Sequence, residues 1–395
     1  MVNNNNQVIM SPITSPTPTD QSLWSSVPWT SVTSPSSSPS GKTIGFWKKF
    51  VPYLVGGLSL QTLDVWIPTP PAATSSNATL PDASTPLNQL TRDNGHWIVY
   101  IHGGAWRDPA VDSTSFSAAA TAILESIDGG KKDADERKGK TKIAGLASIN
   151  YRLSPHASYP APDDPSRQAR HPDHIHDVLA GLSFLQRLWS PPSSSSPKSK
   201  KEVDYVLAGH SCGATLAFQA VMDPSRWTAP NATTTTEEQM AEISKPSVVV
   251  GLNGLYDLAG FIANPPPGEH AQWRDMYELF TRAAFGDDEK TWRDVCPVTA
   301  EGDWVGEWVD DVVDGKGGGK EGGKKKKKVK AVLVQSREDT LVPYEQLEAM
   351  RQRLLVEEKK EGVEVVEREA GLDHNQMWGQ PGRMVEILEE AVGWL

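Results

Sequence analysis

Cysteine is scarce in this sequence of 395 residues, which contains only Cys212 and Cys296. Two cysteines cannot build a disulfide framework, and neither belongs to a CxxC pair or to a Cys/His cluster of the kind that binds zinc. This scarcity fits a reducing compartment. We therefore expect a cytoplasmic protein without a metal site.

Positive charge is also in short supply, since 39 Lys and Arg face 50 Asp and Glu, for a formal net charge of −11. This balance argues against a nucleic-acid partner. The one strong basic run, Lys324 to Lys328, follows a glycine-rich stretch and is typical of a solvated loop insertion.

Long apolar runs are missing as well. The N-terminus has neither the basic nor the apolar segment of a secretory signal, and Val51–Leu60 is about half as long as a membrane span. We therefore expect no membrane association.

The composition divides the chain into a tail and a domain. Residues 1–43 are predicted to form a disordered tail, because Ser, Thr and Pro dominate there and bury little apolar surface. Residues 44–395 should form one globular domain, since 38% hydrophobic residues and 14 tryptophans suffice for a large core. Inside it, 129–142 and 315–328 are predicted loop insertions, and 256–314, rich in Trp, Pro and charge, is a candidate lid.

Strand and helix signals alternate along the domain. A strand at Leu63–Ile67, ended by Pro68, is predicted to lie at the edge of a sheet. Further runs of β-forming residues predict strands at Trp97–Ile101, Ile143–Ile149, Val203–Ala208, Val248–Leu252, Val329–Gln335 and Val363–Glu369. Helix-forming stretches lie at Ser115–Ser126, Asp173–Leu188, Ala214–Ala220, Tyr344–Leu355 and Gly382–Leu395. This alternation predicts an α/β fold with a mostly parallel sheet and helices on both faces.

A GxSxG pentapeptide, Gly209 to Gly213, lies at one predicted strand-to-helix junction. Its two glycines allow a sharp turn in which a Cβ would collide with neighbouring backbone, and the turn lifts Ser211 out of the sheet. This context favours Ser211 as a nucleophile over a simple glycine-rich turn. Cys212, at the variable position, is predicted to be a core residue.

A serine nucleophile needs a histidine that accepts its proton and an acid that orients the histidine. The loop after Val329–Gln335 contains Asp339, and the loop after Val363–Glu369 contains His374. In doubly wound hydrolases, acid and base follow the serine in this order. Glu338 and Asp257 are alternatives for the acid, and Asp339 is preferred over Glu338 for its shorter side chain.

Two further groups of residues have alternative interpretations. The triplet His171, His174 and His176 resembles a metal cluster, but surface histidines at a helix start explain it better. Gly103 and Gly104 follow a predicted strand, where glycine lets backbone N–H groups approach a ligand closely. Together with the Cys212 N–H, they are predicted to form an oxyanion hole.

The sequence resembles the kynurenine formamidases, which belong to the hormone-sensitive-lipase-like branch of the α/β-hydrolases. His102, Gly103, Gly104, Ala105 and Trp106 match the HGGxW signature of that family, whereas lipase-like esterases usually have a third glycine at the Ala105 position. The segments Asn150–Leu153, Ser336–Pro343 and His374–Trp378 complete a resemblance that covers roughly Phe46 to Leu395.

The resemblance implies a triad of Ser211, Asp339 and His374, no metal or organic cofactor, and a small-molecule substrate, N-formyl-L-kynurenine, cleaved to L-kynurenine and formate. It places Trp106 and Trp378 as candidates for contact with the aromatic ring, with core packing as the alternative. A carboxylesterase for short acyl esters is the competing function, and an inactive hydrolase fold used as a binding module is a third. Whether the protein forms a homodimer is left open.

Overall fold

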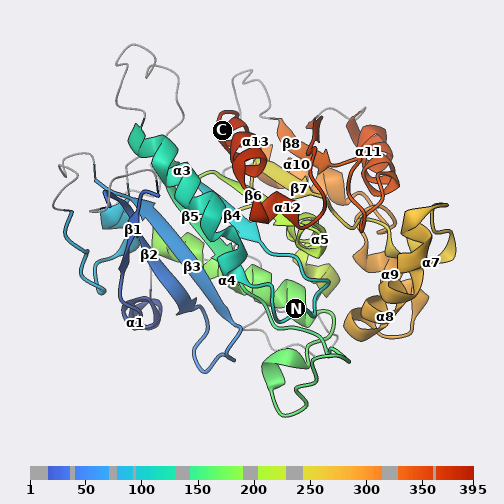
Figure 1. Cartoon of the computed structure of the whole chain (residues 1–395), viewed down its shortest axis with the longest axis horizontal. Coiled ribbons are helices and arrows are strands. Elements are labelled where there is room, and N and C mark those ends of the chain that lie inside the picture. Colours follow the sequence, from blue (N-terminus) through green and yellow to red (C-terminus); the bar gives the residue numbers. More distant parts are fainter. Residues whose placement is uncertain are drawn as a thin grey trace, which may run out of the picture.

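The computed structural model describes residues 17–35, 41–70, 78–91, 95–129, 143–189, 203–227, 243–313, 328–358 and 362–395. They form a nine-stranded sheet with helices on both faces (Figure 1). Of the predicted insertions 129–142 and 315–328, only the terminal residues Gly129 and Lys328 are described, and the rest lies outside the described residues.

The sheet has the order β1-β2-β3-β5-β4-β6-β7-β8-β9. Its strands are β1 (Thr30–Thr33), β2 (Thr43–Pro52), β3 (Thr62–Pro68), β4 (His96–Ile101), β5 (Ile143–Ile149), β6 (Tyr205–His210), β7 (Val248–Leu252), β8 (Val329–Gln335) and β9 (Val363–Glu369). Strands β1, β2, β3 and β5 pair antiparallel, and all pairs from β5 to β9 are parallel. The predicted α/β fold with a mostly parallel sheet is confirmed.

The prediction that Leu63–Ile67 is an edge strand is wrong. Strand β3 pairs with β2 on one side and with β5 on the other, and all seven of its residues are buried. The two strands that cover it, β1 and β2, were not predicted. Their sequence lies in or next to the stretch that was read as a disordered tail.

Helices cover both faces of the sheet (Figure 1). On one face, α3 (Ser117–Gly129) and α13 (Gly382–Val392) pack against alternate strand residues such as Tyr100 and Val250. The other face is covered by α4 (Asp173–Trp189), α5 (Cys212–Gln219) and α11 (Glu345–Glu358). All five match predicted helices with small shifts at their ends, so the alternation of strand and helix is confirmed. No helix in the described ranges is long and apolar enough to cross a membrane.

The prediction of a disordered tail over 1–43 is wrong for residues 17–35. They form helix α1 (Pro18–Ser25) and strand β1, with Trp24 and Trp29 buried. Residues 1–16 and 36–40 lie outside the described residues. Two tryptophans supply enough apolar surface to offset the cost of ordering a Ser/Thr/Pro-rich segment, because each buries a large area.

Polar contacts also hold this segment in place. Asp20 forms an ion pair with Arg187 of α4 at 2.9 Å. The buried ammonium of Lys48 donates to the Trp24 carbonyl at 2.6 Å and lies 4.1 Å from the Trp24 ring centroid. Residues 17–35 therefore belong to the folded part of the chain rather than to a disordered tail.

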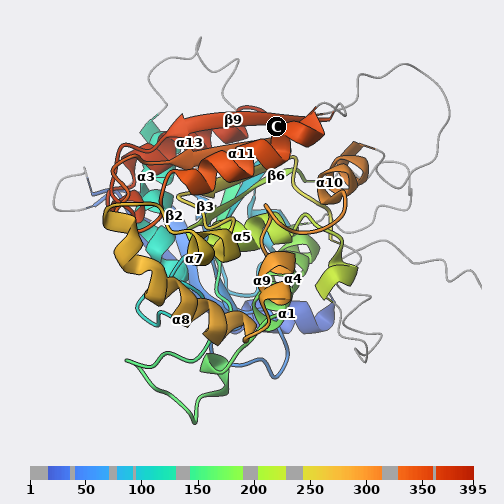
Figure 2. The same ribbon diagram turned by 90° about the vertical axis from the view of Figure 1, so that its right-hand side faces the viewer.

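The candidate lid, 256–314, is helical. It contains α7 (Leu258–Ala263), α8 (Arg274–Phe285), α9 (Glu289–Val295) and α10 (Trp304–Val313). Figure 2 shows α7, α8 and α9 grouped together, and Figure 1 shows them on the side of the molecule opposite β1. Two single-turn helices, α2 (Leu87–Leu90) and α12 (Gln376–Gly379), complete the set of α-helices in the described ranges.

Candidate active site

Ser211 lies in a strained turn between β6 and α5. Its φ of 56° and ψ of −124° fall where a residue with a Cβ rarely lies. A Cβ on Gly209 would lie 2.1 Å from the Gly213 carbonyl oxygen, and a Cβ on Gly213 would lie 2.3 Å from the Ile101 oxygen. Both glycines are therefore required for this turn, which is the geometry expected for a nucleophile.

The backbone of Ser211 is held by the loop that follows β7. Its N–H donates to the Leu252 carbonyl at 2.9 Å, and its carbonyl accepts from Leu255 N–H at 3.3 Å. These bonds, together with the steric constraint from the two glycines, stabilise a conformation that costs on the order of 1–3 kcal/mol.

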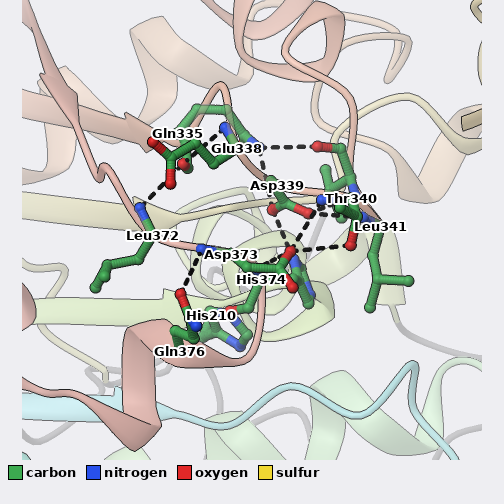
Figure 3. Close-up of polar contacts among 12 residues, drawn as sticks. His210, Gln335, Glu338, Asp339, Thr340, Leu341, Leu372, Asp373, His374 and Gln376 are labelled. Carbon is green, nitrogen blue, oxygen red and sulfur yellow. Dashed lines mark hydrogen bonds and ion pairs between the residues drawn. The ribbon is translucent and has the colours of Figure 1, made fainter. Parts of the chain in front are cut away.

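Asp339 and His374 come together at the carboxyl ends of β8 and β9. The His374 Nδ1–H donates to Asp339 Oδ2 at 2.7 Å, and both side chains are buried (Figure 3). The other carboxylate oxygen, Oδ1, accepts from the N–H groups of Leu341 at 2.9 Å and Val342 at 2.8 Å. This arrangement fixes the carboxylate and assigns the imidazole proton to Nδ1, which leaves Nε2 free to accept a proton.

Neither alternative acid occupies this position. Glu338 is exposed, whereas the Asp257 carboxylate accepts from Gly260 N–H at 2.8 Å and caps helix α7. Of the three candidates, only Asp339 bonds to His374 within the described part of the chain.

His374 is not hydrogen-bonded to Ser211 in the described part of the chain. Its ring centroid instead lies 4.7 Å from that of His210, the residue before Ser211. The His210 Nε2–H donates to the His374 carbonyl at 3.0 Å, which ties the histidine loop to the end of β6 (Figure 3). Burial holds the pKa of His210 well below its usual value, so this ring stays neutral.

The loop from His102 to Trp106 runs beside Ser211. A Cβ on Gly103 would lie 3.1 Å from Ser211 Cβ, so the two backbones are in close contact. Gly104, Ala105 and Trp106 have φ values of 95°, 48° and 58°, which describe a tight left-handed turn. Among the described residues, no protein acceptor is bonded to the N–H of Gly103, Gly104 or Cys212. Such N–H groups are available to a ligand.

The side chains of Tyr151 and Cys212 form hydrogen bonds with this loop. The Tyr151 hydroxyl lies 3.1 Å from the carbonyl oxygens of both His102 and Gly103. Cys212 Sγ accepts from Trp106 N–H at 3.3 Å, and burial raises the pKa of its thiol to about 11. The prediction that Cys212 is a core residue is confirmed, since its side chain is fully buried.

The two candidate substrate-binding tryptophans lie in different parts of the core. Trp106 is fully buried with its ring 4.9 Å from Phe285 and 5.9 Å from Phe280, both on α8. Trp378, on α12, packs against the apolar cluster beneath α3 and α13. The structure therefore does not bring these two tryptophans together, and core packing describes Trp378.

The prediction that His171, His174 and His176 are surface histidines is wrong for His174, which is buried, whereas His171 and His176 are partly buried. His174 is buried with Nε2 2.9 Å from Ser154 Oγ, and His171 contacts the rings of Trp227 and Phe285. His176 donates to the Trp227 carbonyl at 2.7 Å. Among described residues, no group of three or more His, Cys, Asp or Glu could hold a metal ion.

Three residues that contact the site were missed from the sequence: His210, Tyr151 and Gln335. Gln335 Nε2 donates to Asp339 Oδ2 at 3.2 Å and to the Val342 carbonyl at 3.0 Å. Gln335 ends a predicted strand and His210 lies two residues beyond another, at the carboxyl ends of the strands, where ligands bind in open α/β folds. That position was the signal that could have identified them.

Comparison with known proteins identifies relatives over most of the chain, although no family model matches it. A kynurenine formamidase-like hydrolase of Fusarium equiseti is 33% identical over 352 residues, or 87% of this chain and 94% of the relative. A kynurenine formamidase of Aspergillus versicolor is 29% identical over 287 residues, or 72% of this chain and 84% of the relative.

Among solved structures, esterase B from Lactobacillus rhamnosis has the same fold. Its TM-score is 0.50 at 15% identity, and the match covers 88% of this chain and 86% of that chain. The chain belongs to the kynurenine formamidase family and has the α/β-hydrolase fold.

Proposed function

We propose that this protein is a serine hydrolase that cleaves N-formyl-L-kynurenine to L-kynurenine and formate, a step of tryptophan degradation. The observation that carries the proposal is the buried Asp339–His374 hydrogen bond of 2.7 Å beside the strained turn of Ser211. The names of the relatives from Fusarium equiseti and Aspergillus versicolor support the choice of substrate.

The first step forms a formyl-enzyme. His374 Nε2 accepts the proton of Ser211 Oγ as the oxygen attacks the formyl carbon, and Asp339 stabilises the resulting imidazolium. A shift of His374 toward Ser211 on substrate binding completes this contact, since catalytic hydrogen bonds often tighten only in the complex.

The N–H groups of Gly103, Gly104 and Cys212 would then bind the oxyanion. The tetrahedral intermediate places a full negative charge on the former carbonyl oxygen, and fixed N–H dipoles in a dry site stabilise it without reorganisation. Each such donor typically contributes on the order of 10²–10³ in turnover. The lack of protein acceptors for these three N–H groups supports this role.

The intermediate collapses by breaking the C–N bond, and His374 gives its proton to the departing arylamine nitrogen. A water then attacks the formyl ester, with His374 as base, and releases formate and free Ser211. A formyl group attached to an aniline is an activated amide, so this chemistry needs no metal ion.

The same residues would hydrolyse short acyl esters, and a carboxylesterase activity is the alternative. Turnover of N-formyl-L-kynurenine, followed by kynurenine absorbance, should be compared with turnover of p-nitrophenyl acetate and butyrate. We expect kcat/KM to be higher for the formamide by at least tenfold. An equally large preference in kcat/KM for the esters would make the protein a carboxylesterase.

A further inference from the structure

Arg107 is a largely buried arginine whose guanidinium nitrogens still reach solvent and are not engaged in an ion pair among the described residues. Its exposed fraction is 7%, and its guanidinium lies 5.9 Å from the ring centroid of Phe280 on α8. In the described ranges, the guanidinium forms no ion pair and donates no hydrogen bond to another residue. Buried charges in proteins are normally paired, because an uncompensated charge is costly to remove from water.

Two partly buried arginines elsewhere in the chain, Arg152 and Arg187, follow that rule. Arg152 bonds to Asp177 through Nε at 2.8 Å and Nη2 at 2.9 Å, and Arg187 bonds to Asp20 in the same two-pronged way at 2.9 Å. Both are more exposed than Arg107. The lack of an ion pair at Arg107 among the described residues therefore stands out against the pattern in the same molecule.

Asp108 is a nearby counter-charge but forms no ion pair with Arg107. Its Oδ1 accepts from Ala110 N–H at 2.9 Å, and its charge raises the pKa of Arg107 against the effect of burial. Burial lowers the pKa of His156, the charges of Arg107 and Arg167 lower it further, and Asp108 acts in the opposite direction.

Arg107 is also attached to the loop that would bind the oxyanion. Its N–H donates to the Gly104 carbonyl at 3.0 Å, and the preceding Trp106 N–H donates to Cys212 Sγ, one residue beyond Ser211. Opposite this loop, α8 carries Phe280, and Tyr277 of the same helix donates to the Leu341 carbonyl at 3.0 Å in the loop of Asp339. Arg107 thus lies between the oxyanion loop and the helix that contacts the acid loop.

We propose that Arg107 binds the carboxylate of the substrate and selects anionic aryl formamides over neutral ones. This inference rests on the proposed function. An α-amino-acid carboxylate supplies the missing anion, and a guanidinium binds it through two parallel N–H···O bonds. The ring of Phe280, 5.9 Å from the guanidinium, is within the range of a cation–π contact.

Two ligands and four variants test the proposal by binding. N-formyl-L-kynurenine and its decarboxylated analogue, N-formylkynuramine, differ only in the carboxylate. Both are titrated calorimetrically into Ser211→Ala, and into Ser211→Ala combined with Arg107→Gln, Arg107→Lys or Arg167→Gln. Arg167→Gln is the matched control, because this second cation acts on His156 without belonging to the oxyanion loop.

We expect Arg107→Gln to weaken binding of N-formyl-L-kynurenine about 10- to 100-fold, the range for loss of a charge-assisted hydrogen bond. Binding of N-formylkynuramine should change by less than about threefold on the same principle. Arg107→Lys should give an intermediate loss of affinity for the anionic ligand, because it keeps the positive charge and loses the two parallel N–H donors of the guanidinium. Arg167→Gln should leave both affinities near those of Ser211→Ala.

Equal losses for both ligands in Arg107→Gln, or equal losses from Arg107→Gln and Arg167→Gln, would overturn the proposal. If Arg107→Gln does not fold, Arg107→Lys decides the question. Weaker binding of N-formyl-L-kynurenine alone supports the proposal, and equally weaker binding of both ligands refutes it. Tight, Arg107-dependent binding without turnover by the unmodified protein would refute the proposed function alone.

Discussion

The carboxylate of Asp339 holds the imidazole of His374 through a 2.7 Å hydrogen bond, and its second oxygen is fixed by two backbone N–H groups. Asp339→Asn should keep the protein folded, because an amide fits the same space. It should lower turnover on the order of 10⁴-fold, since an amide favours the wrong imidazole tautomer and cannot stabilise the imidazolium.

Glu338→Gln is the matched control for this change, because Glu338 is the neighbouring acid and is exposed. Its turnover should stay within about twofold of the wild type, as for most surface substitutions. Steady-state kinetics with N-formyl-L-kynurenine measures both variants. Reversed effects would assign the acid to Glu338 and refute the role of Asp339.

Tyr151 is expected to position the oxyanion loop. Tyr151→Phe removes the hydroxyl that lies 3.1 Å from the His102 and Gly103 carbonyl oxygens and leaves the stacked ring in place. We expect kcat to fall roughly tenfold with KM little changed, as for loss of one buried hydrogen bond that acts in the transition state. A rise in KM with constant kcat would place Tyr151 in substrate binding instead.

The segment of α1 and β1 should contribute to stability. Trp24→Ala removes a fully buried ring that packs at 5.5 Å against Trp29 and beneath the Lys48 ammonium. We expect a loss of about 3–5 kcal/mol in the free energy of unfolding. Val55→Ala, at an exposed position, should change it by less than about 0.5 kcal/mol. Urea unfolding gives both values, and equal stabilities for the two variants would show that α1 does not dock.

Acid should destabilise the fold through buried histidines. Burial lowers the pKa of His102 and His171 to about 4 and of His174 to about 3. Between pH 6.5 and about 4 the unfolded chain binds protons on these residues and the folded chain does not, so stability falls as pH falls. Each histidine contributes a slope of up to about 1.4 kcal/mol per pH unit.

One buried acid opposes this trend. Burial raises the pKa of Asp64 to about 6, so the folded state binds an extra proton between pH 6 and 3.8 and gains stability there. Together with His210, whose pKa burial also holds well below its usual value, these histidines outweigh one aspartate, and Tm should drop steadily from pH 7 to pH 5. His174→Gln should flatten the slope. A Tm that is constant or rises over this range would contradict these assignments.

The sequence predicted the parts of the candidate site that depend on local order. Strand-to-helix junctions, glycine spacing and the order of serine, acid and histidine along the chain selected Ser211, Asp339 and His374. Each lies at the carboxyl end of a parallel strand, where an α/β sheet places its ligands. Motif and topology therefore constrain the same residues.

Contacts between segments that are distant in the sequence could not be predicted from local order. The composition of residues 1–43 gave no sign that Trp24 would pack over Lys48, or that Asp20 would reach Arg187. Burial of His174 depends on its contacts with Ser154 and Tyr151, and the lack of an ion pair at Arg107 among the described residues is visible only once its neighbours are in place. Such properties come from tertiary packing, which no single stretch of sequence encodes.

The most direct test of the account is the fate of the formyl group at Ser211. The protein should release kynurenine from N-formyl-L-kynurenine, and a rapid acid quench should trap one formyl group on the peptide that contains Ser211, as detected by mass spectrometry. Ser211→Ala should form no such adduct and lose turnover on the order of a million-fold. Kynurenine release by Ser211→Ala at more than about a tenth of the wild-type rate would contradict the central claim, because triad serines contribute far more than tenfold.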